Sequence, residues 1–495
     1  MISFQIKEKK IVGRYATATK ALTAGSVVFE EAPFVIGPNP DSTAICLECY
    51  APVDGTIYGT RCNKCGWPMC DECKLNSSRK NHSKECELFV QNKVKFHNLS
   101  TPHQICLQLD CITPLRICLE KEVNAERWKN EISKMEFHSE IRKNSKIWNA
   151  DKINVVGYLQ GPLKLKDRFS EDLIQQACGI LEVNAFEART AKGHKVRGIY
   201  PNAAVLAHSC VPNTTHSILP SKDYKLVMRT SINVKEGEEL LTTYTHILSG
   251  TRTRERQNNL KKGKFFICKC ERCTDASELG TNFSSLLCKK CEDGVILPTN
   301  PLDETAEYKC QKCSFMTPGS AVQSLIKTID GEIAQLQEIE TTIENIKLCE
   351  NVFTKYSKIL HSNHFLLISL KENLIDMYGW HLSNQIDNDA VVFECLDRKI
   401  ALCREVLNVV SILQPGLNRA RAMLIYEIYT SIGAIIKKNS ASVANRGQHI
   451  MEAKKLLSEC LTIFEWEDEN SLEFYLARIC RKISNELQSM EEFNM

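Results

Sequence analysis

The sequence has no long hydrophobic run and no excess of charge of either sign. Its apolar runs, such as residues 406–413 (VLNVVSIL), are far too short to span a bilayer, and residues 1–10 carry charges where a signal peptide needs apolar residues. Lys and Arg number 63 against 60 Asp and Glu, so the composition favours neither nucleic acid nor a membrane surface as the main partner. The sequence therefore predicts an intracellular protein, found in the nucleus and cytoplasm, without a membrane anchor.

At 495 residues, the chain is long enough for about three domains. Apolar residues make up 43%, which excludes wholesale disorder because a large core can be buried. Cysteine is unusually frequent, with 24 residues. Because nothing indicates export, close cysteine pairs are more readily explained as metal ligands than as disulfides.

The densest group of such residues lies at 46–86, here called the finger. Its pairs are Cys46-x2-Cys49, Cys62-x2-Cys65, Cys70-x2-Cys73 and His82-x3-Cys86. Thiolates and an imidazole in this number suit two tetrahedral zinc ions. The favoured arrangement is a cross-brace, although spacing alone leaves the interleaving open. One ion is then bound by Cys46, Cys49, Cys70 and Cys73, and the other by Cys62, Cys65, His82 and Cys86.

Two further cysteine groups follow. The first group has three close ligands, Cys268, Cys270 and Cys273, and needs a fourth from elsewhere. The second group is a zinc-ribbon pattern, Cys288-x2-Cys291 with Cys310-x2-Cys313, and is here called the ribbon. Sites with four protein ligands have no open position, so the zinc is predicted to be structural. The other nine cysteines, which lie in apolar or helical context, are interpreted as small buried hydrophobic residues: Cys106, Cys111, Cys118, Cys178, Cys349, Cys395, Cys403, Cys460 and Cys480.

Strand and helix signals alternate along the chain. Residues 12–22 and 26–37 are β-branched or aromatic runs separated by Thr23-Ala24-Gly25, a hairpin signal. Residues 88–180 mix helical periods with polar breaks, and the apolar residues of 128–148 have nearly helical spacing. Strand character returns over 181–247. From 321 onward the pattern is helical, punctuated at Gly379, Pro415-Gly416 and Asn445-Arg446-Gly447, and its intervals of roughly 30–40 residues predict a helical-repeat array.

Several of these segments resemble parts of one known family. The finger resembles a MYND zinc finger, except that its third pair is Cys-x2-Cys where that finger usually has Cys-x3-Cys. Residues 207–213 (AHSCVPN) resemble the Asn-His-Ser-Cys-x-Pro-Asn box of SET-domain lysine methyltransferases, and residues 238–244 (EELLTTY) resemble their closing tyrosine motif. The group Cys268, Cys270 and Cys273 resembles their post-SET zinc cluster. Residues 413–428 also resemble the helical domain of the SMYD proteins.

Over essentially the whole chain, this order resembles the SMYD proteins, which are SET domains split by a MYND finger, and in particular an insect-type branch with an extra ribbon. The resemblance implies an α+β multidomain fold with a mainly β SET domain. The implied parts are the N-terminal part of the SET domain (1–45), the finger (46–86), a helical insertion (87–180), the C-terminal part of the SET domain (181–250), the post-SET cluster and ribbon (251–320), and a TPR-like helical domain (321–495). It also implies that Cys210 completes the post-SET cluster, which makes four structural zinc ions.

The resemblance further implies transfer of a methyl group from S-adenosylmethionine to a lysine of a protein partner, by a monomer. The lysine amine must be neutral and in line with the methyl group, inside a narrow aromatic channel. The implied cofactor contacts are Gly13, Asn184, His208, Tyr244 and Phe266, and Tyr244 is the implied catalytic channel residue. Tyr244 read alone is more readily explained as a structural strand tyrosine, whereas its context favours the channel.

Three positions depart from the family pattern. Ile11 replaces the first glycine of an N-terminal Gly-x-Gly, Ala207 replaces the box asparagine, and Lys264 replaces a second channel tyrosine. These departures support a second hypothesis, in which the chain is a catalytically weakened scaffold that acts as a transcriptional co-regulator. The basic stretch 251–264 is expected to be a solvated helix face, with a groove for an acidic partner or nucleic acid as the alternative.

Overall fold

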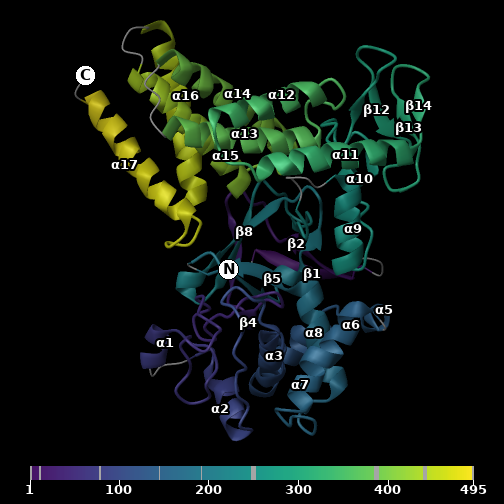
Figure 1. Ribbon diagram of the computed structural model, residues 1–495, viewed down its shortest axis with the longest axis vertical. Helices are drawn as coiled ribbons and strands as arrows, with labels where there is room; N and C mark the ends of the chain where they lie inside the picture. Colours follow the sequence, from purple (N-terminus) through teal and green to yellow (C-terminus); the bar gives the residue numbers. More distant parts are fainter. Residues whose placement is uncertain are drawn as a thin grey trace.

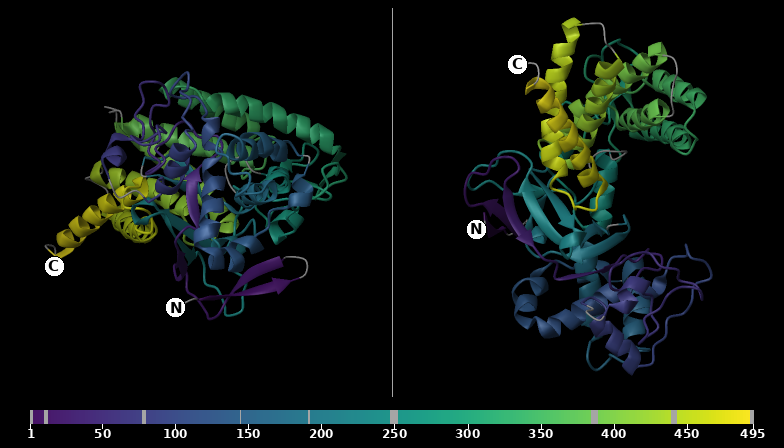
Figure 2. Two further views of the ribbon diagram at one scale, coloured as in Figure 1. Left: turned by 90° about the horizontal axis from the view of Figure 1, so that it is seen from below. Right: turned by 90° about the vertical axis from the view of Figure 1, so that its left-hand side faces the viewer.

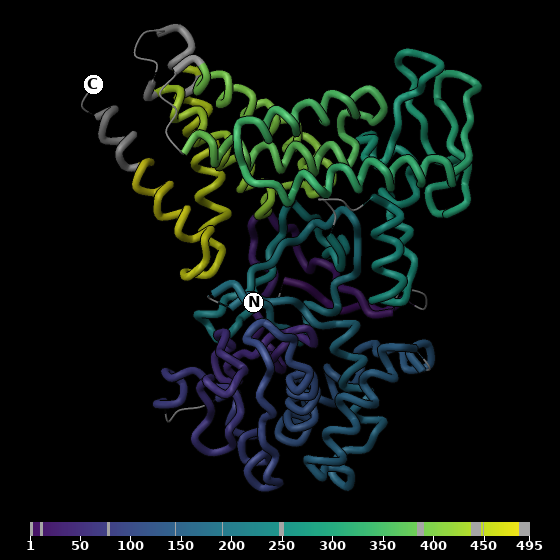
Figure 3. The backbone as a smooth tube through the Cα atoms, viewed as in Figure 1, coloured from purple at the N-terminus to yellow at the C-terminus, as the bar shows by residue number. Residues whose placement is uncertain are grey.

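The computed structural model describes residues 3–9, 13–76, 80–143, 145–190, 192–246, 252–383, 389–438 and 443–492. The molecule is elongated (Figure 1). The finger and insertion lie at one end, a region of short strands lies in the middle, and the helical array lies at the other end beside the ribbon, as the backbone trace also shows (Figure 3). Among the described helices, none is both long and apolar enough to cross a membrane.

The middle region consists of four small sheets. Its strands are β1 (Phe4–Lys9), β2 (Gly13–Ala18), β3 (Val27–Glu31), β4 (Val35–Pro38), β5 (Phe186–Arg189), β6 (Lys195–Ile199), β7 (Ala207–His208), β8 (Thr214–Leu219), β9 (Lys225–Thr230) and β10 (Leu241–Thr242). β1 and β2 form the first sheet, and β7 and β10 form a parallel pair. The other two sheets have three strands each, in the orders β3-β9-β8 and β4-β6-β5. Strands that precede the finger thus pair with strands that follow the insertion.

The hairpin predicted around Thr23-Ala24-Gly25 is wrong. β2 pairs with β1 and β3 pairs with β9, so the two runs do not pair with each other. The turn is bonded to the end of β9 instead, because the Gly25 N–H donates to the Thr230 carbonyl (2.8 Å) and the Thr230 hydroxyl donates to the Thr23 carbonyl (2.7 Å). Gly25 has a φ of +83°, which suits glycine in such a turn.

The finger and insertion contain short helices. They are α1 (Asp71–Leu75), α2 (Ser83–Gln91), α3 (Ile112–Val123), α4 (Ala125–Asn130), α5 (Ser139–Arg142), α6 (Lys146–Asp151), α7 (Gly157–Gln160) and α8 (Glu171–Asn184). α3 buries eight of its twelve residues and α8 seven of its fourteen, and α3 packs against both α8 and β4. The nearly helical spacing of 128–148 does not make one helix, because His138 adopts a left-handed φ of +44° that interrupts it, and Ile141 is 61% exposed.

The post-SET segment and ribbon follow. Their elements are α9 (Thr253–Gly263), α10 (Glu271–Thr274), β11 (Leu286–Leu287), β12 (Val295–Pro298), β13 (Tyr308–Cys310) and β14 (Met316–Thr317). The four strands form one antiparallel sheet in sequence order. This sheet carries the cysteines of the ribbon and shares a hydrophobic core with the first helices of the array.

The array consists of antiparallel helices in which each helix from α13 onward packs beside its predecessor. They are α11 (Gly319–Gln337), α12 (Ile343–Tyr356), α13 (Phe365–Ser383), α14 (Asp389–Leu413), α15 (Arg419–Lys438), α16 (Val443–Phe464) and α17 (Leu472–Glu492). Pro415-Gly416 separates α14 from α15, as predicted, whereas Asn445-Arg446-Gly447 falls inside α16. Gly379 lies inside α13, where a Cβ would be 3.1 Å from the buried Lys399 ammonium nitrogen.

Two turns of the array rest on the strand region (Figure 2). The Leu417 N–H donates to the Ser231 carbonyl (2.8 Å), and the Arg229 guanidinium lies 5.1 Å from the centre of the Trp466 ring. A Cβ at Gly416 would lie 2.0 Å from the Ser231 oxygen, and the φ of Gly416 is +79°, so glycine is required at this contact.

Candidate active site and metal centres

The structure gathers the sixteen predicted zinc ligands into four groups, in each of which all ligand atoms lie within 4.8 Å of one another. The grouping in the finger is the interleaved one. The groups are Cys46, Cys49, Cys70 and Cys73; Cys62, Cys65, His82 and Cys86; Cys210, Cys268, Cys270 and Cys273; and Cys288, Cys291, Cys310 and Cys313.

The sulfur–sulfur distances fit a shared metal ion. Cys49 and Cys70 Sγ lie 3.6 Å apart, and Cys62 and Cys86 Sγ lie 3.7 Å apart. In a tetrahedral site with Zn–S bonds of ~2.3 Å, two sulfurs are ~3.8 Å apart, whereas a disulfide bond is ~2.05 Å long. The four donor sets therefore suit four structural zinc ions.

A buried charge network joins one zinc site of the finger to the insertion. His82 Nε2 lies 3.3 Å from Cys65 Sγ, and His82 Nδ1 lies 3.2 Å from Glu85 Oε1. Arg116, from α3, donates to Glu85 through Nε (2.7 Å) and Nη2 (2.5 Å) and to the Leu47 carbonyl (2.7 Å). Burial alone would raise the pKa of Glu85, but the Arg116 guanidinium holds that pKa below its ordinary value. Glu85 thus orients the zinc-binding imidazole as a carboxylate.

The post-SET cluster also has buried cations beside it. Cys210 follows β7, and its Sγ lies 3.5 Å from Cys273 Sγ. Arg256 donates to Cys273 Sγ (3.8 Å) and to Glu278 (3.0 Å), while Arg272 donates to the Cys210 carbonyl (3.5 Å) and to Glu278 (2.9 Å). Four thiolates around one divalent zinc leave an excess of negative charge, which these guanidinium groups offset.

Three aromatic rings form a cluster against this zinc site. The ring centres of His208 and Tyr244 are 5.2 Å apart, those of His208 and Phe266 are 5.8 Å apart, and those of Tyr244 and Phe266 are 6.4 Å apart with perpendicular planes. The Tyr244 hydroxyl donates to the Leu206 carbonyl. Burial raises the pKa of Tyr244 to about 12, so the phenol stays protonated and its orientation is fixed by that bond.

The His208 side chain links the rings to the metal site. Its Nδ1 accepts a hydrogen bond from the Tyr244 N–H (3.0 Å), and its Nε2 lies 3.4 Å from Cys210 Sγ. Burial lowers the pKa of His208 to about 4, so the imidazole is neutral and carries its proton on Nε2. The resemblance implied His208 only as a cofactor contact, and this link between the rings and the metal site is an additional finding.

Asn184 and Arg14, the neighbour of Gly13, bond to one loop of the insertion. The Asn184 side-chain amide donates to the Glu136 carbonyl (2.8 Å), and Arg14 donates to the Lys134 carbonyl (2.9 Å). Gly13 has a φ of +75°, and among the described residues, its chain neighbours aside, no atom lies within 4 Å of the position that a Cβ would take.

Two of the three departures lie among the described residues, whereas Ile11 lies outside them. Ala207 pairs with Leu241 in the register of β7 and β10 and presents only a methyl group. Lys264 donates to the Val183 carbonyl (2.7 Å) at the end of α8, and its Nζ lies 6.0 Å from the centre of the Tyr244 ring. Burial lowers the pKa of Lys264, while the negative end of the α8 dipole offsets its charge.

Sequence reasoning missed the charged partners of the zinc sites. A signal for the first network was present, because Glu85 follows His82 at the i, i+3 spacing of a helix and Arg116 interrupts the apolar run ITPLRICL. No comparable signal marked Arg256, Arg272 and Glu278, since their contacts depend on the fold.

Comparisons with known proteins agree with these features. A model of the SET domain family matches residues 13–245. SET domain-containing protein SmydA-8, isoform A, of Drosophila melanogaster is 27% identical over 427 residues, which cover 84% of this chain and 85% of that protein. The human histone-lysine N-methyltransferase SMYD1 is 25% identical over a region that covers 53% of this chain and 54% of SMYD1. The human N-lysine methyltransferase SMYD2 is 35% identical over a shorter region, which covers 36% of this chain and 35% of SMYD2.

The first prediction concerns the buried network of the finger. Arg116→Met should lower the free energy of unfolding around the finger by about 3–5 kcal/mol, because Glu85 is left buried without its cation. Native-state hydrogen exchange over residues 46–123 measures this loss. Arg168→Met is the matched control, since its partner Glu122 is 40% exposed and such a pair contributes at most about 1 kcal/mol. Equal losses in both variants would contradict the assigned network.

The second prediction concerns Cys210. Cys210→Ser should reduce the zinc content from four ions to three, because a hydroxyl is a poor zinc ligand, and should speed hydrogen exchange in residues 263–275. Elemental analysis measures the zinc content. Cys178→Ser is the control, since Cys178 is buried in α8 and belongs to none of the four groups. A Cys210→Ser protein that retains four zinc ions would place the fourth ligand elsewhere.

Proposed function

We propose that this chain, which belongs to the SMYD family of SET-MYND proteins and is of the insect type, transfers the methyl group of S-adenosylmethionine to a lysine of a protein. The observation that carries the proposal is the cluster of His208, Tyr244 and Phe266, which packs against the zinc site of Cys210. The match to the SET family and the methyltransferase names of SMYD1 and SMYD2 support the same chemistry.

The residues around the cluster fit the proposed cofactor. Gly13 has a positive φ and can accept a close approach to its backbone, Asn184 bonds to the same insertion loop as the neighbouring Arg14, and Phe266 offers a half-buried aromatic face. His208 is neutral and adds no positive charge beside a sulfonium. When bound, S-adenosylmethionine supplies an electrophilic methyl group.

Tyr244 has the properties that a channel wall requires. Its hydroxyl is protonated and is held by the Leu206 carbonyl, so the ring has one fixed orientation. A fixed, largely apolar wall excludes water and favours the neutral form of an entering lysine amine, which is the form that attacks a methyl group. We therefore assign Tyr244 as the catalytic channel residue.

The second candidate function is a scaffold with weakened catalysis that acts as a transcriptional co-regulator. Ala207 favours it, because its methyl group cannot make the hydrogen bonds of a side-chain amide. Lys264 favours it less than the sequence suggested, because the end of α8 offsets part of the cation's charge. A role in gene regulation, a monomeric state, and a location in the nucleus and cytoplasm are part of the proposal under either function.

The third prediction tests Tyr244. Tyr244→Phe should slow methyl transfer by about 10²-fold or more, because the ring loses the bond that orients it in the channel. Incorporation of radiolabelled methyl groups into an array of lysine-containing peptides measures the rate. Tyr200→Phe is the control, because it removes a buried hydroxyl that binds the Tyr224 carbonyl (2.7 Å) outside the cluster. The role of Tyr244 is disproved if its phenylalanine variant is as fast as the control.

The fourth prediction separates the two candidate functions. Ala207→Asn restores an amide and should tighten S-adenosylmethionine binding a few-fold to about tenfold in calorimetry, as expected for one hydrogen bond of about 0.5–1.5 kcal/mol. Ala207→Leu has a similar shape without the amide and should give no gain. Lys264→Tyr should act mainly on the transfer rate, because it rebuilds an aromatic wall. Brisk transfer by the unaltered protein, unchanged by both restorations, would remove the support for the scaffold.

A further inference from the structure

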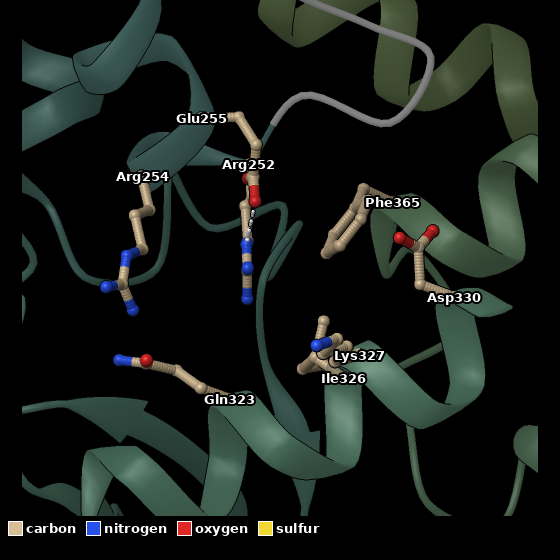
Figure 4. A pocket seen from close by; sticks show the side chains of 8 residues that line it. All are labelled: Arg252, Arg254, Glu255, Gln323, Ile326, Lys327, Asp330 and Phe365. Atoms are coloured by element: carbon tan, nitrogen blue, oxygen red, sulfur yellow. Dashed lines mark hydrogen bonds and ion pairs between the residues drawn. The ribbon is translucent and has the colours of Figure 1, made fainter.

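A pocket between α9 and the array takes no part in the function proposed above (Figure 4). Its volume is about 310 Å³, which is at the lower end of the range for small-ligand pockets, about 300–1,000 Å³. Ile326 and Phe365 form an apolar floor and are each only 3% exposed. Arg252 and Arg254, at the start of α9, stand opposite Gln323 and Lys327 of α11.

The polar groups of the pocket are arranged for a single negative charge. Arg252 donates through its Nε to Glu255 (2.5 Å). Its two terminal nitrogens are therefore available to a ligand, and Figure 4 shows them directed into the pocket. Lys327 is exposed and has no ion-pair partner among the described residues. The lining includes three cations and two carboxylates, those of Glu255 and Asp330, and Arg254 is also paired with Glu304 from outside the lining (3.3 Å), so Arg252 and Lys327 are the cations left to bind an anion. A guanidinium fork matches a carboxylate, and the two acidic side chains disfavour a doubly charged phosphate.

The pocket and the candidate channel lie at opposite ends of α9. Arg252 precedes the first residue of the helix, and Lys264, beside Tyr244, follows the last. Eleven helical residues extend ~16 Å, at 1.5 Å per residue. One loop reaches both places, since Leu302 packs against the cluster that includes Tyr244, while Glu304 pairs with Arg254 (3.3 Å). An extended polypeptide covers ~3.3–3.6 Å per residue, so about five residues bridge the two places.

We propose that this pocket binds the carboxylate of an aspartate or glutamate in the polypeptide that is methylated, about five or more residues from the target lysine. This inference rests on the proposed function and names its substrate class, a lysine segment with an acidic flank. It also assigns the first turn of the basic stretch 251–264 to a groove for an acidic partner. Nucleic acid is disfavoured because two carboxylates line the same small pocket.

The test compares two labelled peptides that differ only in glutamate or glutamine placed five to eight residues from a single lysine. Fluorescence anisotropy with the zinc-loaded full chain and S-adenosylhomocysteine measures their affinities. The glutamate peptide should bind about five- to tenfold more tightly, as expected for one charge-assisted hydrogen-bonded pair near the surface. Arg252→Gln and, independently, Lys327→Gln should reduce that preference to about twofold or less. Lys262→Gln is the control, because Lys262 is exposed at the other end of α9.

The results of these measurements separate the pocket assignment from the proposed methyl transfer. Equal affinity for the two peptides at every spacing, or the same loss of preference in Lys262→Gln, overturns the pocket assignment even if methyl transfer is observed. Displacement of the glutamate peptide by a short duplex DNA, abolished by Arg252→Gln, overturns it in favour of nucleic acid. A preference for glutamate that depends on Arg252 and Lys327, without methyl transfer to any peptide, upholds the pocket and counts against the proposed function alone.

Discussion

Coordination of one metal ion by thiolates from distant parts of the chain is the interaction on which the candidate site depends. Cys210 follows β7 in the strand region, whereas its three partners follow α9. Joining them brings Phe266, which lies just before the later cysteines, against His208 and Tyr244. Without this zinc site, Phe266 would not be held against Tyr244. The zinc that stabilises the fold therefore also assembles the candidate site.

Buried charge is matched at each of these metal sites. In the finger, Glu85 orients the zinc-binding His82 and is itself held by Arg116 from the insertion. Beside the post-SET cluster, the guanidinium groups of Arg256 and Arg272 meet Glu278 and the thiolates. Because a buried charge is costly unless it is paired, these networks fix how the finger and the post-SET segment sit against their neighbours.

The sequence was most informative where interactions are local. Cysteine spacing predicted the ribbon site and the ligand pairs of the finger, because each pair spans only a few residues, but it left the interleaving open, and the resemblance supplied the mainly β fold and the link through Cys210. Sequence reasoning failed where distant segments compete. Thr23-Ala24-Gly25 resembles a hairpin turn locally, yet β9 binds it. The bond of Lys264 to the carbonyl group at the end of α8 also had no signal in the sequence, because the two residues meet only in the fold.

The proposed function requires that the zinc-supported cluster of His208, Tyr244 and Phe266 binds S-adenosylmethionine. Titration calorimetry of S-adenosylmethionine into the full chain, with its zinc content verified as four ions, measures this binding. We expect one molecule bound per chain and weaker binding in Phe266→Ala, which removes an aromatic face while leaving the zinc ligands in place. A folded protein with four zinc ions and no detectable binding would contradict the proposed function.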